Sequence, residues 1–247
     1  MTPAEPIETS PPVAPAPSPA PRASWLPYVA PMATFLVATS LEDYLPKAEG
    51  GPDPSWYPIA YAIKVAVVTA IVVACRSTWR DLRPWPSAGS VGLAVGIGLA
   101  VVAAWVGLDG LYPVPTWFGG GKRASFDPNV LPTAARLGFL AVRLYGLVLL
   151  VPFFEEIFWR SFAIRYVIDP DFTRVPIGRV TPMAAGITAA VFAMAHPAEW
   201  LPALLTGLAW AWLLHRTRSL TACVISHAVA NLGLGGYILA TGAWKFW

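Results

Sequence analysis

Seven long, mostly apolar stretches follow one another along the chain and leave few folds open to it. A helix needs about 20 mostly apolar residues to cross the hydrocarbon layer of a bilayer. Only 13% of the 247 residues are charged, whereas soluble domains carry roughly 25%. The sequence therefore predicts an all-α fold, a polytopic transmembrane bundle of about seven (six to eight) helices. The stretches run approximately over 25–41, 56–75, 88–108, 133–152 with a continuation to about 168, 181–196, 200–215 and 219–241.

The first residues differ in composition from the rest. Residues 1–24 hold eight prolines, with alanine and serine between them. Such a run cannot bury a core and favours extended, solvated conformations, so we expect a disordered Pro/Ala-rich tail. Residues 25–247 are expected to form one integral membrane domain.

Loop charges predict an orientation in the membrane. The loops after the second, fourth and sixth stretches are rich in arginine, whereas the loop after the first is acidic. Because cytoplasmic loops carry the excess of Lys and Arg, we expect a cytoplasmic amino terminus and a carboxyl terminus outside. Lys122 and Arg123, in an outward loop, count against this assignment. The net charge of +3 is small and spread over short loops, which makes nucleic acid an unsuitable partner.

The stretch FFEEIFWR, residues 153–160, places three charges inside the fourth apolar segment. A charge at the centre of a membrane helix costs roughly 2.5–3.5 kcal/mol and usually faces the protein interior or a watery cavity. Glu156 and Arg160 are four residues apart and share a helical face, with the acid first. This spacing predicts a structural ion pair between them. Glu155 projects about 100° away from Glu156 and is left as a candidate general base.

Two later segments supply further polar groups. In FAMAH, Phe192 and His196 are four apart, and Pro197 disfavours continuing the helix, so His196 lies near a helix end. In SHAVAN, His227 and Asn231 present an imidazole and a carboxamide on one helical face. A carboxylate and an imidazole can deprotonate a water, and two donors can stabilise an oxyanion. The set therefore suits peptide hydrolysis without a covalent enzyme intermediate.

These motifs, in this order, resemble those of the CAAX-processing and bacteriocin-processing (CPBP) intramembrane proteases, also called type II CAAX endopeptidases or abortive-infection proteins. The resemblance covers about residues 133–241. The stretches WYPIAYAIK and VRLYGLVLLVPFFEEIFWRSF look closest to bacterial CAAX-protease-related proteins associated with exosortase systems. The resemblance to this family implies an integral membrane protease domain over 25–247, in a bacterial inner membrane. Such a protease would act on a membrane-associated protein or peptide. Membrane lipid is the other implied partner, and oligomeric state is left open.

The resemblance also implies a role for each matched residue. Glu155 matches the family's catalytic glutamate and His196 the histidine that helps it activate water. His227 and Asn231 match the pair that stabilises the oxyanion. The supporting positions are Glu156, Arg160 and Phe192. Ser161 departs from the pattern, because many members have glycine after the arginine.

Three alternatives stay open. Family members are regarded as glutamic proteases that need no metal, but Glu155, His196 and His227 could supply three zinc ligands with one position open to water. The polar cluster could instead be purely structural, in a non-enzymatic membrane scaffold or immunity-like factor. Glu and His in membrane helices also mark proton relays, although no inverted repeat that would favour a transporter is visible.

Other features carry expectations of their own. We expect the active site to lie in a polar cavity among the fourth, fifth and seventh segments that opens to the cytoplasm. Lys64 and Arg143 either line this cavity or extend to the membrane surface and pair locally. His215 is expected at the membrane interface. Gly92 and Gly96 form a GxxxG pattern, typical of a dimer seam or of close packing within the bundle. The two cysteines are expected to be reduced packing thiols.

Overall fold

The computed structural model describes residues 24–48, 51–114 and 125–246. The predicted tail, residues 1–24, lies outside this part of the chain apart from its last residue, as do Lys122 and Arg123. The helices are α1 (Leu26–Glu42), α2 (Tyr57–Ala74), η1 (Arg76–Leu82), α3 (Ala88–Gly107), η3 (Pro128–Val130), α4 (Thr133–Leu144), η4 (Tyr145–Leu150), α5 (Val151–Glu156), η5 (Ile157–Ala163), α6 (Ile164–Ile168), η6 (Phe172–Arg174), α7 (Pro182–Met194), η7 (Pro197–Glu199), α8 (Trp200–Thr217), α9 (Leu220–Thr241) and η8 (Trp244–Phe246). The strands β1 (Lys47–Ala48) and β2 (Gly51–Pro52) form a short antiparallel hairpin.

The all-α membrane bundle predicted from the apolar stretches is confirmed. The segments from α4 to α6 form one helix of 36 residues, Thr133–Ile168. Counted with it, the described residues form seven long helices at the seven predicted positions. Four of these are long and apolar enough to cross a membrane. The starts of three helices follow from their sequences, because Ser87, Thr181 and Ser219 each accept a hydrogen bond from the backbone three residues later.

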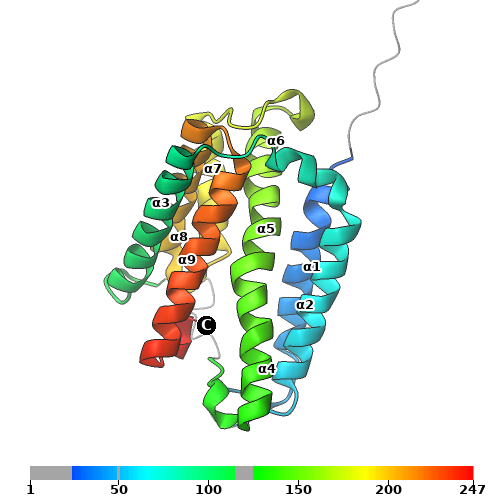
Figure 1. The fold of residues 1–247 in the computed structure, drawn as a ribbon, viewed down its shortest axis with the longest axis vertical. Helices are drawn as coiled ribbons and strands as arrows, with labels where there is room; N and C mark the ends of the chain where they lie inside the picture. Colours follow the sequence, from blue (N-terminus) through cyan, green and yellow to red (C-terminus); the bar gives the residue numbers. More distant parts are fainter. Residues whose placement is uncertain (1–23, 49–50, 115–124, 247) are drawn as a thin grey trace, which may run out of the picture.

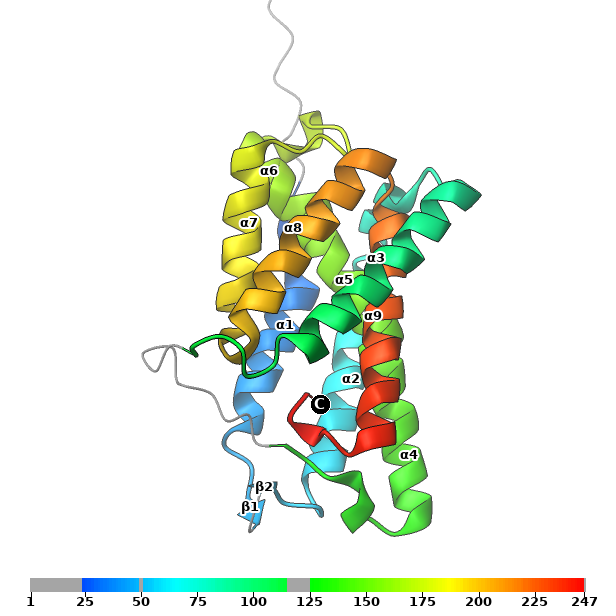
Figure 2. The same cartoon turned by 90° about the vertical axis from the view of Figure 1, so that its left-hand side faces the viewer.

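Each long helix runs opposite to the one before it, so the connections gather at two ends (Figure 1). The pair α1 and α2 packs on one side of the long helix, and α3, α7, α8 and α9 pack on the other (Figures 1 and 2). We call the end formed by η1 and the loops 169–181 and 217–219 the arginine-rich end. The opposite end, with the β1–β2 hairpin and the carboxyl terminus, is the hairpin end.

A buried ionic network closes the arginine-rich end. Asp81 in η1 accepts hydrogen bonds from Tyr28 (3.0 Å), Ser161 (2.6 Å) and Arg165 (2.7 Å). Arg165 also donates to the Ser161 hydroxyl at 2.7 Å. The network joins α1, η1 and the long helix. It gives Ser161, which departs from the family pattern, a specific role that glycine has no side chain to fill.

Close packing in the bundle uses glycines other than those of the GxxxG pattern. A side chain at Gly98 in α3 would lie 2.6 Å from the Ser226 carbonyl of α9, and one at Gly233 in α9 would lie 2.8 Å from Val102. Added side-chain atoms at Gly92 and Gly96 would meet no described atom within 4 Å. The GxxxG pattern of Gly92 and Gly96 therefore does not mark close packing within the bundle, and that interpretation is wrong.

The two cysteines are unpaired, and the third histidine is exposed. Cys75 and Cys223 are free thiols, and Cys223 is fully buried between helices. His215 is exposed in the last turn of α8, at the arginine-rich end.

Candidate active site

The long helix carries Glu155 deep into the bundle. At 1.5 Å per residue, Glu155 lies about 33 Å from Thr133 and about 20 Å from Ile168. The helix is α-helical in α5 but π-helical on both sides, in η4 and η5. Short π-helical segments within α-helices are frequent at functional sites. The predicted continuation of this helix to about residue 168 is confirmed, and it places Glu155 inside the bundle.

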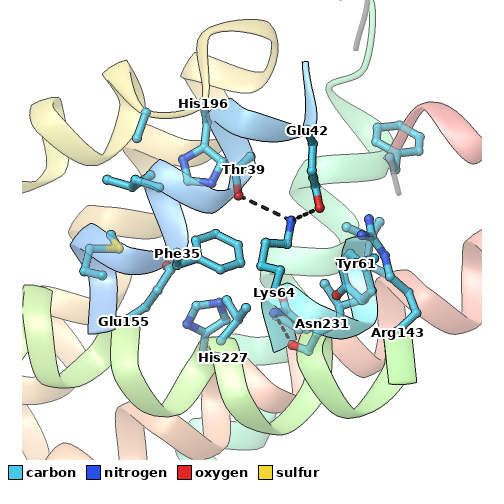
Figure 3. Close-up of a pocket in the computed structure, with 18 of the residues that line it drawn as sticks. Phe35, Thr39, Glu42, Tyr61, Lys64, Arg143, Glu155, His196, His227 and Asn231 are labelled. Atoms are coloured by element: carbon cyan, nitrogen blue, oxygen red, sulfur yellow. Dashed lines mark hydrogen bonds and ion pairs between the residues drawn. The ribbon is translucent and has the colours of Figure 1, made fainter. Parts of the chain in front are cut away.

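Glu155 lines a cavity of about 640 Å³ between the helices, a volume typical of ligand sites. His196, His227 and Asn231 line the same cavity (Figure 3). The structure therefore brings together the four residues predicted to act on the substrate, from α5, the end of α7 and α9. The side chain of Glu155 is 7% exposed, and within the described residues no hydrogen bond or ion pair holds its carboxylate.

Glu156 occupies the centre of a buried cluster next to this cavity. Its carboxylate contacts the Arg160 guanidinium at 3.2 and 3.3 Å, so the ion pair predicted from the spacing of four is present. The same carboxylate accepts a hydrogen bond from His227 Nδ1 at 2.9 Å. This second contact could not be predicted from the sequence, because 71 residues separate the partners and no helical period relates them.

The contact with Glu156 fixes the state of the His227 ring. The Glu156 carboxylate accepts the bond, so Nδ1 carries a proton. His227 Nε2 can then donate a hydrogen bond only when the ring is doubly protonated. The ring stacks on Trp210, with centroids 4.2 Å apart. The Arg160 guanidinium lies 5.0 Å from the centre of the Trp210 ring.

His196 is held by its own helix. Its Nδ1 lies 2.9 Å from the Phe192 carbonyl oxygen, which can only accept, so Nδ1 is the donor. In the neutral ring Nε2 then carries the lone pair and can accept a proton. The Phe192 ring packs against the imidazole, with centroids 4.5 Å apart, and lies 5.4 Å from Arg160. Phe192 thus links the two polar motifs of the long helix and α7.

Asn231 completes a gap in the hydrogen bonding of the long helix. In η4 the Val151 N–H donates to the Gly146 carbonyl, five residues back. The next carbonyl in this register, that of Leu147, faces Pro152, which has no N–H. Asn231 Nδ2 donates to the Leu147 carbonyl instead, at 2.7 Å. The Asn231 amide has a second N–H, and Asn231 lines the cavity.

A second group of charges lines the cavity nearer the hairpin end. Lys64 is 6% exposed and forms an ion pair with Glu42 at 2.7 Å. Arg143 donates to the Tyr57 hydroxyl at 3.4 Å and lies 4.6 Å from the Tyr61 ring. Both cations line the cavity (Figure 3). Both also have local partners, so lining the cavity and pairing locally are not exclusive for Lys64 and Arg143.

The residues of the zinc hypothesis do not form a metal-binding group. Among the described residues, no three His, Cys, Asp or Glu side chains are arranged so that they could hold a metal ion. Glu155, His196 and His227 line the cavity separately, and His227 directs Nδ1 to Glu156. The donor set as arranged does not fit a three-ligand zinc site.

Comparison with known proteins agrees with the motifs. Residues 137–233 match a family model described as type II CAAX prenyl endopeptidase Rce1-like. No curated protein and no solved structure matches the chain. The matched residues include most of the long helix, all of α7 and α8, and the part of α9 that bears His227 and Asn231. Residues 137–233 are therefore similar to the Rce1-like type II CAAX prenyl endopeptidases, which supports the resemblance of the motifs to the CPBP membrane proteases.

Proposed function

We propose that this protein is an intramembrane endopeptidase in which Glu155 and His196 activate a water molecule, and His227 and Asn231 stabilise the oxyanion. Its substrate is a membrane-associated protein or peptide. The observation that carries the proposal is the convergence of these four side chains, from three helices, on one cavity.

Water activation is assigned to Glu155 and His196. Within the described residues no side chain pairs with the Glu155 carboxylate, and His196 has its lone pair on Nε2 because Nδ1 donates to the Phe192 carbonyl. The water oxygen attacks the scissile carbonyl carbon while its proton passes to Glu155. When the tetrahedral intermediate collapses, the C–N bond breaks and Glu155 returns the proton to the leaving amine.

Oxyanion stabilisation is assigned to His227 and Asn231. The negative charge forms on the former carbonyl oxygen, and donors already in place stabilise it without reorganisation. Glu156 positions the His227 ring through the hydrogen bond at Nδ1, and the proposed role uses the doubly protonated ring, which has a donor at Nε2. The Leu147 carbonyl positions the Asn231 amide in the same way.

The proposed mechanism uses no metal ion, since a carboxylate and an imidazole supply the base. Activity should therefore persist in excess chelator. Loss of activity that added zinc restores would contradict this part of the proposal.

The proposal also includes location and orientation. The protein lies in a bacterial inner membrane, with its amino terminus in the cytoplasm and its carboxyl terminus outside. The support is the arginine-rich end, which gathers Arg76, Arg80, Arg83, Arg165, Arg174, Arg179, Arg216 and Arg218. Placement in the exosortase-associated subset stays a prediction from the sequence.

The test compares membrane proteomes by terminal-peptide mapping. Cells would carry the intact protein, Glu155→Gln, or His215→Gln as a control, because His215 is exposed and does not line the cavity. We expect a set of new termini in cells with the intact and His215→Gln proteins, and its loss with Glu155→Gln at equal protein level. Termini that persist with Glu155→Gln would overturn the mechanism. They would favour the scaffold or immunity-like alternative, in which the buried Glu156 cluster only holds helices together.

A further inference from the structure

His196 lies beyond the end of its helix. The last residue of α7 is Met194, and the backbone of His196 has φ −126° and ψ 62°, which is not helical. Pro197 follows and begins the short helix η7. Helix ends fray, because their last residues lack part of the intrahelical hydrogen bonding. A histidine at this place that must present one nitrogen to a water molecule therefore needs contacts from outside α7.

Two aromatic side chains hold the His196 ring. Phe192, one turn earlier in α7, packs against the imidazole, and its carbonyl accepts the hydrogen bond from Nδ1. Trp105, in the last turn of α3, meets the imidazole edge to face, with ring centroids 5.7 Å apart and planes at 90°. Edge-to-face contacts with centroids about 4.5–7 Å apart are a favoured arrangement of rings. Together the two contacts restrict rotation of the imidazole and keep Nε2 in one direction.

Trp105 is itself fixed by a hydrogen bond from another helix. Its indole Nε1 donates to the Thr206 hydroxyl of α8 at 3.0 Å. Thr206 is 2% exposed, so water has little access to this bond. The indole N–H is the one polar group of the Trp105 side chain, and its bond sets how the ring is turned. Trp105 and Thr206 both line the cavity that holds Glu155.

The residues after α3 also hold the turn that follows His196. The Tyr112 hydroxyl donates to the Ala198 carbonyl at 3.2 Å, and Trp200 Nε1 donates to the Pro113 carbonyl at 2.9 Å. The rings of Tyr112 and Trp200 pack edge to face, with centroids 5.8 Å apart. Figure 2 shows the segment that leaves α3 passing beside the turn between α7 and α8. The end of α3 and the residues after it therefore support both the ring and the backbone of this turn.

We infer that Trp105 is a positioning residue for His196, and that its hydrogen bond to Thr206 holds the imidazole in the orientation that water activation requires. The inference rests on the proposed function, because it assigns a further residue to the same reaction. Trp105 lies outside residues 137–233, which match the family model, and belongs to none of the three motifs. Catalysis is sensitive to such contacts, since a misplacement of about 1 Å can lower a rate about 100-fold.

Substitutions at Thr206 test the hydrogen bond without changing either ring. Thr206→Val removes the hydroxyl and keeps a branched side chain, whereas Thr206→Ser keeps the hydroxyl. In the terminal-peptide assay, at equal protein level, we expect termini that depend on Glu155 to appear about 10- to 100-fold more slowly with Thr206→Val and to recover with Thr206→Ser. Thr188→Val is the control, because Thr188 is 7% exposed in α7 and donates to carbonyls of its own helix. An unchanged rate with Thr206→Val, or an equal loss with Thr188→Val, would overturn the inference.

A double variant tests whether Thr206 acts through Trp105. Trp105→Phe keeps an aromatic ring and removes the N–H, so we expect it to lower the rate as Thr206→Val does. In a chain that already carries Trp105→Phe, Thr206→Val should have no further effect, because the bond is already absent. A full additional loss in the double variant would overturn the inference.

A spectroscopic measurement reports on the His196 ring directly. The chain has three histidines. The full chain, labelled with ¹³C at histidine Cε1 and placed in lipid nanodiscs, would give three signals, which His215→Gln and His196→Gln assign. We expect Thr206→Val to move the His196 signal and to leave the His227 signal in place, which also shows that the variant is folded. A His196 signal that does not move would overturn the inference.

The two measurements separate this inference from the proposed function. If no termini depend on Glu155, the proposed function fails, and the histidine signals still decide whether Trp105 and Thr206 hold the ring. If the His196 signal moves while the rate of cleavage stays the same, the contact is only structural and the positioning role is overturned.

Discussion

Arg160 offers the sharpest test of what stabilises the site. Its side chain is 3% exposed and contacts Glu156 through two nitrogens at 3.2 and 3.3 Å. Removing one partner of a buried ion pair costs about 3–5 kcal/mol, because the other charge stays buried without compensation. Arg160→Met keeps much of the packing against Trp210 and Phe192 and removes the charge. For a chain of this size about 1 kcal/mol corresponds to about 2–4 °C, so we expect the melting temperature to fall by about 6–20 °C.

A double variant separates charge pairing from lost packing. Glu156→Gln alone leaves Arg160 as the uncompensated charge, and Glu156→Gln with Arg160→Met removes both charges. We expect the double variant to lose less stability than the sum of the two single losses, by about 0.5–3 kcal/mol. Strict additivity would show that the two side chains do not interact.

Melting would be followed by the intrinsic fluorescence of the 12 tryptophans in lipid nanodiscs. Arg174→Met is the control, because Arg174 pairs with Asp171 at 2.8 Å but its side chain is 78% exposed. Such an exposed pair contributes about 0–1 kcal/mol. Similar small shifts for Arg160→Met and Arg174→Met would refute the assignment of a buried, stabilising pair to the site.

Three further predictions concern the other polar contacts. Lys64→Met and Glu42→Gln should each lower the melting temperature more than the double variant does, because each leaves one buried charge; a double variant as unstable as the singles would contradict this. Asn231→Leu should cost about 1–3 kcal/mol in thermal melts by leaving the Leu147 carbonyl without a donor, in addition to abolishing cleavage in the terminal-peptide assay. Ser161→Ala removes a hydrogen bond to a charged group and should cost about 1.5–3 kcal/mol by the same melts, whereas an unchanged melting temperature would show that Asp81 needs only its other donors.

Features that depend on neighbours in sequence could be predicted. The helix positions followed from apolar stretches long enough to cross a bilayer, and the Glu156–Arg160 pair followed from a spacing of four. The angle of 100° computed for Glu155 assumed an α-helical period. That period does not continue past Glu156, because η5 is π-helical.

Contacts between distant segments could not be predicted. The bonds from His227 to Glu156 and from Arg165 to Asp81 join residues 71 and 84 positions apart. They depend on which helices become neighbours, and no period in the sequence encodes that. The end of the bundle at which the cavity opens could not be predicted either, because it depends on how the two ends of the bundle pack.

The bond from Asn231 to the Leu147 carbonyl has a consequence for the order of assembly. In a bilayer a backbone carbonyl without a donor costs several kcal/mol, since no water is present to replace the missing group. Pro152 leaves Leu147 in that position until α9 has docked. The helix that carries Glu155 precedes α9 in the chain, so its backbone hydrogen bonding is complete only after the last long helix of the described chain has docked. A chain shortened before residue 231 would keep its long helix in the bilayer with this carbonyl unsatisfied.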